Sequence, residues 1–222
     1  KKGLFPNTKW KKNNLGKGWV LGETLITGIG QGYIQSTPLQ LCMMTAQIAN
    51  GGYAIKPKII VDNNPISYED AKQSMESGLL FDSSSDTLLD KKLFKNKKNI
   101  KIVQEAMFSS TNERFGTSYK SRIDDPKYQF AGKTGTAQVK RISKRERELD
   151  LELEQIPYKD RDHALYIAYG PYINPRYALS IIVEHGGSGS KAAAPIANKL
   201  FKLIIDRHEL RNKQSNFERI TI

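Results

Sequence analysis

The feature that most constrains the fold is a pair of apolar, aromatic runs close together in the chain. Residues 163–170 and 177–185 are rich in Ala, Ile, Leu and Tyr, and the short segment between them contains Pro171 and Pro175. Two such runs joined by a turn-rich segment predict an antiparallel β-hairpin. Residues 130–139 have a similar strand-like pattern. The sequence therefore predicts a small antiparallel sheet.

Helices are predicted beside this sheet. Thr37 and Gln40 flank Pro38 in the pattern of a capping box, which indicates a helix start. The helix should end near residue 49, where Asn50-Gly51-Gly52 favours a left-handed stop. Because it is apolar on more than one side, we expect it to be buried between layers. Apolar spacing predicts two further helices, over residues 100–115 and 192–206.

The other segments have weaker patterns. We interpret them as a loop with short strands (1–35), a strand (53–61), an irregular excursion (62–100), a charged hairpin or tongue (140–162) and a polar tail that frays (207–222). Together, the elements predict an α+β fold in which an antiparallel sheet is flanked by helices.

Composition excludes several classes of protein. Cys42 is the only cysteine, so an internal disulfide and a four-cysteine zinc site are both impossible, and in its apolar run it is expected to be a packing residue. His163 and His208 have no metal-ligand spacing with each other or with Cys42, so we expect no metal. We also expect no cofactor. No run approaches the roughly 20 apolar residues of a membrane helix. The net charge of +12 raises nucleic acid as a partner, but scattered lysines without interleaved aromatics disfavour it.

The motif that suggests chemistry is Lys133-Thr134-Gly135-Thr136. It differs from a phosphate-binding P-loop, because Lys127 occupies the position of the first glycine and the residues that follow continue a strand. A Lys-Thr-Gly strand also occurs in penicillin-binding enzymes, together with S-x-x-K and S-x-N elements. On such a strand, lysine supplies a cation, the threonine hydroxyls bind a carboxylate, and glycine lets a substrate backbone lie close.

The surroundings of the motif resemble class B penicillin-binding proteins, most closely the elongation type, the penicillin-binding protein 2 group. The matching blocks occur in the order of the family, at residues 28–33, 37–41, 48–52, 131–138, 169–171 and 183–196. The resemblance implies a penicillin-binding transpeptidase fold and a D,D-transpeptidase activity that cross-links peptidoglycan stem peptides by acyl transfer and binds β-lactams.

The resemblance also implies roles for individual residues. Lys133 would be the cation of the third motif, and Thr134 and Thr136 would hold the carboxylate of the substrate or of a β-lactam. Gly135 would leave room for the substrate, and the N–H of Thr136 would donate to the oxyanion. The implied partners are a membrane glycosyltransferase and elongation-complex proteins. The implied location is the periplasmic side of the bacterial inner membrane, with an anchor outside this chain.

The nucleophile remains unknown, because the S-x-x-K and S-x-N elements of the family precede the block at residues 28–33. Ser188-Gly189-Ser190-Lys191 and Ser110-Thr111-Asn112 match those spacings, but their places in the chain are wrong for the family. His185 lacks positioned triad partners and is interpreted as structural. We therefore expect residues 1–222 to be the C-terminal part of one transpeptidase domain whose N-terminal half is missing, and the isolated chain to be inactive.

Two other classes of function stay open. The chain could be a non-catalytic remnant of the fold that binds cell wall or protein partners, or, less favoured, a basic nucleic-acid-binding protein. A half-domain should also leave apolar surface uncovered, and we expect this around residues 39–48 and 166–169.

Overall fold

The computed structural model describes residues 2–55, 57, 92–140 and 151–220. Three antiparallel strands lie in the order β1-β2-β3, with bounds Ala131–Ala137, His163–Gly170 and Tyr177–Val183. The predicted hairpin is confirmed as the β2–β3 pair, and the predicted third strand is β1. On β1, Lys133 pairs with Ile167 and Thr134 pairs with Tyr166, so the two side chains point to opposite faces of the sheet.

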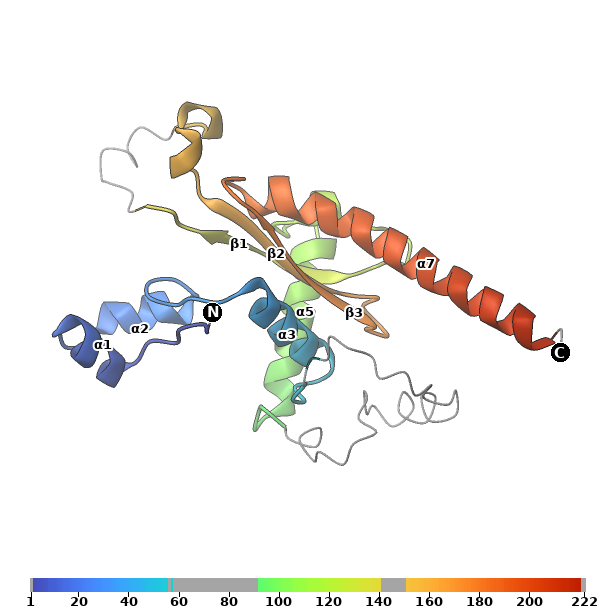
Figure 1. The fold of residues 1–222 in the computed structure, drawn as a ribbon, viewed down its shortest axis with the longest axis horizontal. Coiled ribbons are helices and arrows are strands. Elements are labelled where there is room, and N and C mark those ends of the chain that lie inside the picture. The colour runs from blue at the N-terminus through green and yellow to red at the C-terminus, as the bar shows by residue number, and fades with distance from the viewer. Residues whose placement is uncertain (1, 56, 58–91, 141–150, 221–222) are drawn as a thin grey trace.

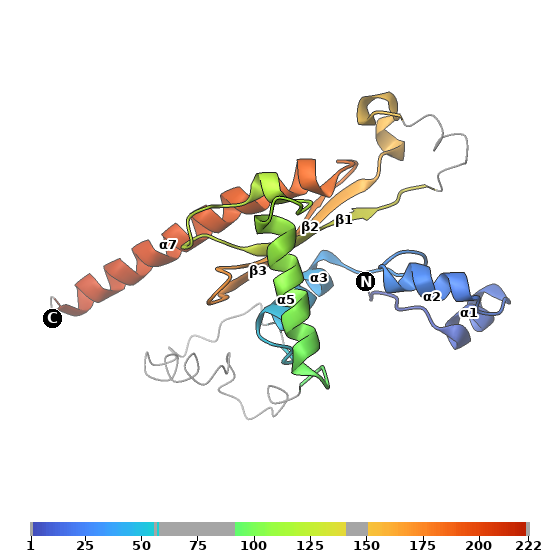
Figure 2. The ribbon, with the colours of Figure 1, turned by 180° about the vertical axis from the view of Figure 1, so that it is seen from behind.

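Helices lie on both faces of this sheet, as the α+β interpretation requires. Figure 1 shows α7 (Ala194–Ile220) on one side, with α3 (Pro38–Ala49) and α5 (Lys97–Asn112) on the other, and Figure 2 shows the same arrangement from behind. A short π-helical turn, Gly189–Ala193, leads from the β3 end into α7.

The main core lies between the sheet and α7. Phe130 is completely buried, stacks on Phe201 at 4.8 Å between ring centroids, and meets Tyr166 edge-on at 6.4 Å. The buried alanines of α7 allow the helix to approach the sheet closely. The fully buried members of this cluster are Phe130, Ala164, Tyr166, Ala168, Ala193, Ala194, Ala197, Phe201 and Ile205.

Helix α3 begins where the sequence predicts. The Thr37 hydroxyl accepts from the Gln40 N–H at 3.2 Å, and the Gln40 side chain accepts from the Thr37 N–H at 2.9 Å. The prediction that α3 is buried between layers is wrong. Thr45 is the one fully buried residue of this helix, and Leu39 is 56% exposed. One face contacts β3, where the Cys42 thiol donates to the Ala178 carbonyl at 3.4 Å.

The prediction of loop and short strands for residues 1–35 is also wrong, because two helices occur there, α1 (Thr8–Leu15) and α2 (Leu21–Gly28). Two of the Asn and Gly residues that suggested a loop act as helix caps instead. Asn7 accepts from the Trp10 N–H at 2.8 Å, and Gly16, with φ of 64°, ends α1. An ion pair of 2.5 Å between Lys11 and Glu23 joins the two helices.

Helix α5 is present but starts earlier than predicted, because Asn96 caps it by accepting from the Lys98 N–H at 2.9 Å. Residues 97–100 therefore belong to a helix and not to the irregular excursion. Most of that excursion, and most of the strand predicted over 53–61, lie outside the described residues. Tyr53 forms an isolated bridge with Lys92.

In the charged segment 140–162, the described residues are Lys140 and 151–162, and the latter include two single 3-10 turns, Leu153–Gln155 and Tyr158–Asp160. Residues 141–150 lie outside the described part.

The prediction of a fraying tail after residue 206 is wrong, because α7 continues to Ile220. Lys127 forms ion pairs with Asp206 at 3.0 Å and with Glu209 at 2.8 Å, which hold this helix against the loop before β1.

Exposed apolar surface occurs only partly where it was expected. Leu39 and Met44 on α3 are exposed, in agreement with the expectation for residues 39–48. Tyr166 and Tyr169 are completely or almost completely buried, so the expectation for residues 166–169 is wrong. The reason is that α7 covers one face of β2, while Met107 and Phe108 of α5 pack against the other.

Candidate active site on strand β1

The four residues of the motif lie on the exposed strand of the sheet. Among the described strands, β1 pairs with β2 alone, so its other edge is open. Lys133 and Thr136 are exposed, and Thr134 and Gly135 are half-buried. Period-two alternation places Lys133 on the α3 face, whereas Thr134 and Thr136 share the α7 face.

A groove of about 770 Å³ lies between β1 and the segment that joins α2 to α3. Its lining combines the glycine-rich block after α2 with the motif, and includes Ile29, Gly30, Gln31, Gly32, Lys133, Thr134, Gly135 and Thr136. The Gln31 side chain donates to the Thr136 carbonyl at 3.1 Å across this groove. The fold thus brings together two blocks that are more than 100 residues apart in the sequence.

The carbonyls on the open edge of β1 are engaged by side chains. In an antiparallel pair, residues that bond to the partner strand alternate with residues whose N–H and C=O point away from it. The acceptors on the open edge are Gly132 (from Thr111, 3.4 Å), Thr134 (from Lys133, 3.0 Å) and Thr136 (from Gln31, 3.1 Å). By the same alternation, the N–H of Thr136 also points to the open edge and not to β2.

A hydroxyl network that sequence reasoning missed supports the motif from the α7 face. The Thr134 hydroxyl lies 3.2 Å from the Lys133 ammonium and 3.2 Å from the Thr117 hydroxyl, and Thr117 in turn lies 3.2 Å from the Ser110 hydroxyl. No motif marks Thr117 in the sequence. Only the tertiary contact between the loop after α5 and β1 shows its position.

A second set of hydroxyls lies beneath the start of the motif. The buried Tyr166 hydroxyl is 2.9 Å from Thr111 and 3.0 Å from Ser118. Burial raises the pKa of Tyr166, so this phenol stays neutral and acts as a hydrogen-bonding partner. Its ring lies directly under Gly132, where a Cβ would collide with it. Gly132 is therefore required by packing immediately before Lys133.

The Gly-rich segment after β3 also reaches the motif. A Cβ at Gly189 would collide with the carbonyl oxygens of Leu165 and Gly135, so the backbone of this segment lies close to the β1–β2 pair at these two residues. Ser188 and Ser190 in the same segment are hydrogen-bonded to each other through their hydroxyls at 2.9 Å.

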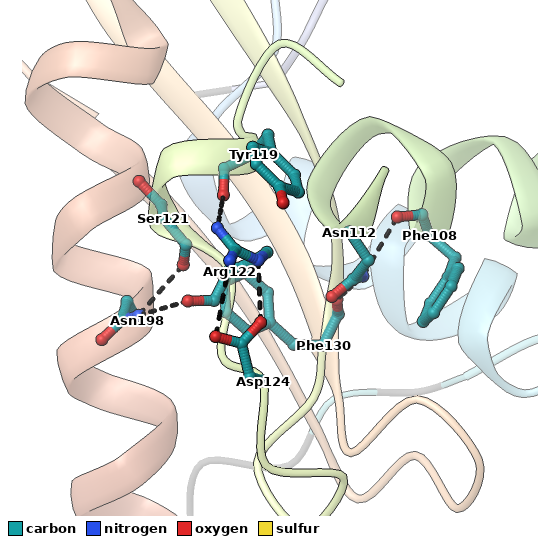
Figure 3. Close-up of polar contacts among 8 residues, drawn as sticks. All are labelled: Phe108, Asn112, Tyr119, Ser121, Arg122, Asp124, Phe130 and Asn198. Atoms are coloured by element: carbon teal, nitrogen blue, oxygen red, sulfur yellow. Dashed lines mark hydrogen bonds and ion pairs between the residues drawn. The ribbon is translucent and has the colours of Figure 1, made fainter. Parts of the chain in front are cut away.

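Asn112 and His185, which the sequence analysis set aside as non-catalytic, have structural contacts. Asn112 donates to the carbonyls of Phe108 and Phe130 at 3.0 and 2.9 Å, which ties α5 to the start of β1 (Figure 3). The His185 ring bonds to the Arg161 carbonyl at 2.9 Å, and its backbone N–H donates to His163 at 2.9 Å. Within the described ranges, no group of three or more His, Cys, Asp or Glu side chains could hold a metal ion.

Residues 5–202 match the family described as the penicillin binding protein transpeptidase domain. The chain belongs to this family. The peptidoglycan D,D-transpeptidase MrdA of Salmonella typhimurium (strain SL1344) is 31% identical over 208 residues, which cover 92% of this chain and 30% of that protein. MrdA of Escherichia coli (strain K12) is 29% identical over 216 residues, with 92% and 29% covered.

Solved structures of penicillin-binding protein 2 resemble this member of the transpeptidase family. The protein from Pseudomonas aeruginosa, in complex with WCK 5153, has a TM-score of 0.64 and 33% identity, with 90% of this chain and 37% of that chain covered. The Helicobacter pylori protein, in complex with MreC, has a TM-score of 0.63 and 30% identity, with 90% and 31% covered. The chain thus spans about a third of the length of these relatives.

No helix within the described residues is both long enough and apolar enough to cross a membrane.

Proposed function

We propose that this chain forms the substrate-binding wall of a peptidoglycan D,D-transpeptidase, an enzyme that cross-links stem peptides by acyl transfer and binds β-lactams. The observation that carries the proposal is the placement of Lys133-Thr134-Gly135-Thr136 on an open strand edge beside a groove, within a family match over residues 5–202. In this proposal, residues 1–222 contribute the C-terminal part of one transpeptidase domain.

Each residue has a role that its geometry supports. Lys133 provides the cation and orients the Thr134 hydroxyl, which it contacts at 3.2 Å. Thr134 and Thr136 hold a substrate carboxylate, and Gly135 leaves the strand surface open to the substrate backbone. The Thr136 N–H, on the open edge, donates to the oxyanion, and the bond from Gln31 to the Thr136 carbonyl holds the next peptide unit of the strand in place.

The nucleophile is not assigned to any residue of this chain. Ser36 is the one serine among the described residues that line the groove, and Leu39 stands three positions after it where an S-x-x-K element requires lysine. Ser188, which has the required Lys191, is hydrogen-bonded within its turn. In the proposal, the acyl-forming serine comes from outside these 222 residues, and the chain alone forms no acyl ester.

Partners and location follow from the family. The solved complex of Helicobacter pylori penicillin-binding protein 2 with MreC supports elongation-complex proteins as partners. A membrane glycosyltransferase as a further partner, and a position on the periplasmic side of the inner membrane, are proposed from the family resemblance alone.

A binding experiment on the 222-residue chain tests the groove. In a titration of the isotope-labelled chain with benzylpenicillin followed by NMR, we expect weak, saturable shifts at Gln31 and at residues 133–136. Thr136→Val and Lys133→Gln should remove these shifts, because they delete the hydroxyl and the cation that bind the carboxylate. Lys97→Gln, at an exposed site on α5, is the control with the same loss of charge. Shifts that are absent, or that survive both groove variants, would contradict the proposal.

The missing nucleophile has a separate test. Incubation with a fluorescent penicillin, followed by intact-mass measurement, should show no added mass. A mass increase equal to one penicilloyl group would show that a serine of this chain is reactive and would overturn the assignment of the nucleophile to another polypeptide segment.

A further inference from the structure

A second cavity lies on the α7 face, between the loop after α5 and the first turns of α7. It has a volume of about 700 Å³, within the range typical of small-molecule sites. We call it the junction pocket. It is lined by Arg114, Gly116, Thr117, Ser118, Tyr119, Lys120, Ser121, Ser190, Lys191, Pro195, Asn198 and Lys199.

The charge of the junction pocket is entirely positive. Its lining includes four cations and no carboxylate: Arg114, Lys120, Lys191 and Lys199. Among the described residues, none of the four takes part in an ion pair. By contrast, nearby Arg122 is paired with Asp124 at 2.8 Å and lies over the Tyr119 ring at 4.0 Å. Cations gathered around a concave surface repel one another, and a bound anion relieves that repulsion.

The wall of the junction pocket is held in place by neutral hydrogen bonds. Asn198 on α7 donates to the carbonyls of Ser121 and Arg122 at 3.0 and 3.1 Å, as Figure 3 shows. Ser118 is buried and bonds to both the Ser110 carbonyl and the Tyr166 hydroxyl. These bonds fix the backbone beside Lys120 and Lys199 in the absence of a ligand, which lowers the entropy cost of binding there.

The junction pocket also adjoins the candidate active site. Thr117 lines the pocket, and its hydroxyl lies 3.2 Å from that of Thr134, one of the proposed carboxylate-binding residues. Ser190 lines the pocket one position after Gly189, whose backbone lies close to Gly135 of β1 and Leu165 of β2. A peptide held at β1 by one carboxylate could thus place a second acidic group in the pocket.

We propose that the junction pocket is a subsite for carboxylates of an acidic peptide substrate, bound by the cations at positions 114, 120, 191 and 199. The link to the substrate rests on the proposed function of β1, whereas the binding of carboxylates by the pocket does not. A cavity of this size accepts an acidic side chain with its neighbouring backbone, and the serine and threonine hydroxyls of the lining add hydrogen-bond donors.

Calorimetric titration of the 222-residue chain with an N-acetylated triglutamate peptide tests the proposal. We expect the double variant Lys120→Gln/Lys199→Gln to bind about tenfold more weakly, which corresponds to about 1.4 kcal/mol. The control Lys97→Gln/Lys98→Gln removes the same charge from an exposed helix start far from the pocket in the sequence, and should bind as the unaltered chain does. Thermal unfolding followed by circular dichroism checks that both variants are folded.

Three outcomes would overturn the subsite. Equal weakening in the two double variants would show general attraction to a chain of net charge +12. Undetectable binding at about 10 mM peptide would mean an affinity below the usual range for a recognised ligand, and would show that the pocket binds no such carboxylate. Tighter binding of inorganic phosphate at the same four positions would assign the pocket to phosphate instead.

The two proposals fail separately. Lys133→Gln should abolish the benzylpenicillin shifts, whereas Lys120→Gln/Lys199→Gln should leave them unchanged, because benzylpenicillin has a single carboxylate and β1 binds it. If the junction pocket binds carboxylates while β1 binds no penicillin, the subsite stands and the proposed function of β1 fails.

Discussion

The sheet with α7 and the helix pair α1–α2 both contain large apolar residues, but these residues are buried in the first region and exposed in the second. Phe130, Tyr166 and Phe201 are completely buried between the sheet and α7. On α2, Leu21 and Leu25 are 77% and 67% exposed, and no residue of that helix is fully buried. An apolar residue stabilises the fold only when a second layer covers it, so the sheet and α7 form the stable part of the described structure.

The largest effect should come from the centre of the sheet and α7. Phe130→Ala removes a ring packed against Phe201 and Tyr166, and should lower the free energy of unfolding by about 3–5 kcal/mol. Leu25→Ala is the matched large-to-small change on α2 and should alter it by less than about 0.5 kcal/mol. Urea unfolding measures both. Similar losses in the two variants would mean that α2 is as well packed as the sheet, contrary to the comparison.

A smaller effect is expected at the hydroxyl network beneath the motif. Tyr166→Phe removes the phenol that bonds to Thr111 and Ser118, leaves their buried hydroxyls with fewer partners, and should cost about 1–2 kcal/mol of unfolding free energy. Amide NMR shifts should change at Gly132 and Thr134. Tyr158→Phe, at an exposed tyrosine, should leave both the stability and these shifts unchanged; a comparable response there would show that the network does not support β1.

The smallest effect is expected in acid, at the contact between α7 and the loop before β1. The hydrogen bond from Tyr128, at 2.5 Å, and the ion pair with Lys127 lower the pKa of Asp206. A carboxylate with a lower pKa in the folded chain stabilises the fold above its unfolded pKa of about 4, and this stabilisation is lost as the pH falls through the folded pKa.

Stability measured by urea unfolding should therefore decrease as the pH falls below about 4. In Asp206→Asn, the part of this decrease that comes from Asp206 should be missing. An identical pH dependence in the variant and in the unaltered chain would show that the Tyr128 and Lys127 contacts contribute nothing in solution.

The helices at the two ends of the chain show why sequence patterns were insufficient there. Asn7 and Gly16 are of residue types that are common in loops, and only the hydrogen bond of Asn7 and the dihedral angles of Gly16 identify them as caps of α1. The polar residues after 206 predict fraying, because the pattern cannot show that Lys127 lies within reach of Asp206 and Glu209. Thr117 was missed for the same reason: its contact with Thr134 joins segments that no local pattern connects.

By itself, the sequence determined the β2–β3 hairpin, the capped start of α3, the strand that contains Lys133 and the family of the chain. These features follow from local periodicity, turn residues and short motifs, which are encoded by neighbouring residues. Only the tertiary structure decided which apolar residues are buried, that Gln31 and Thr117 support the motif, and that four cations surround the junction pocket. Burial and charge clustering depend on contacts between distant segments, and those contacts exist only after the layers have packed.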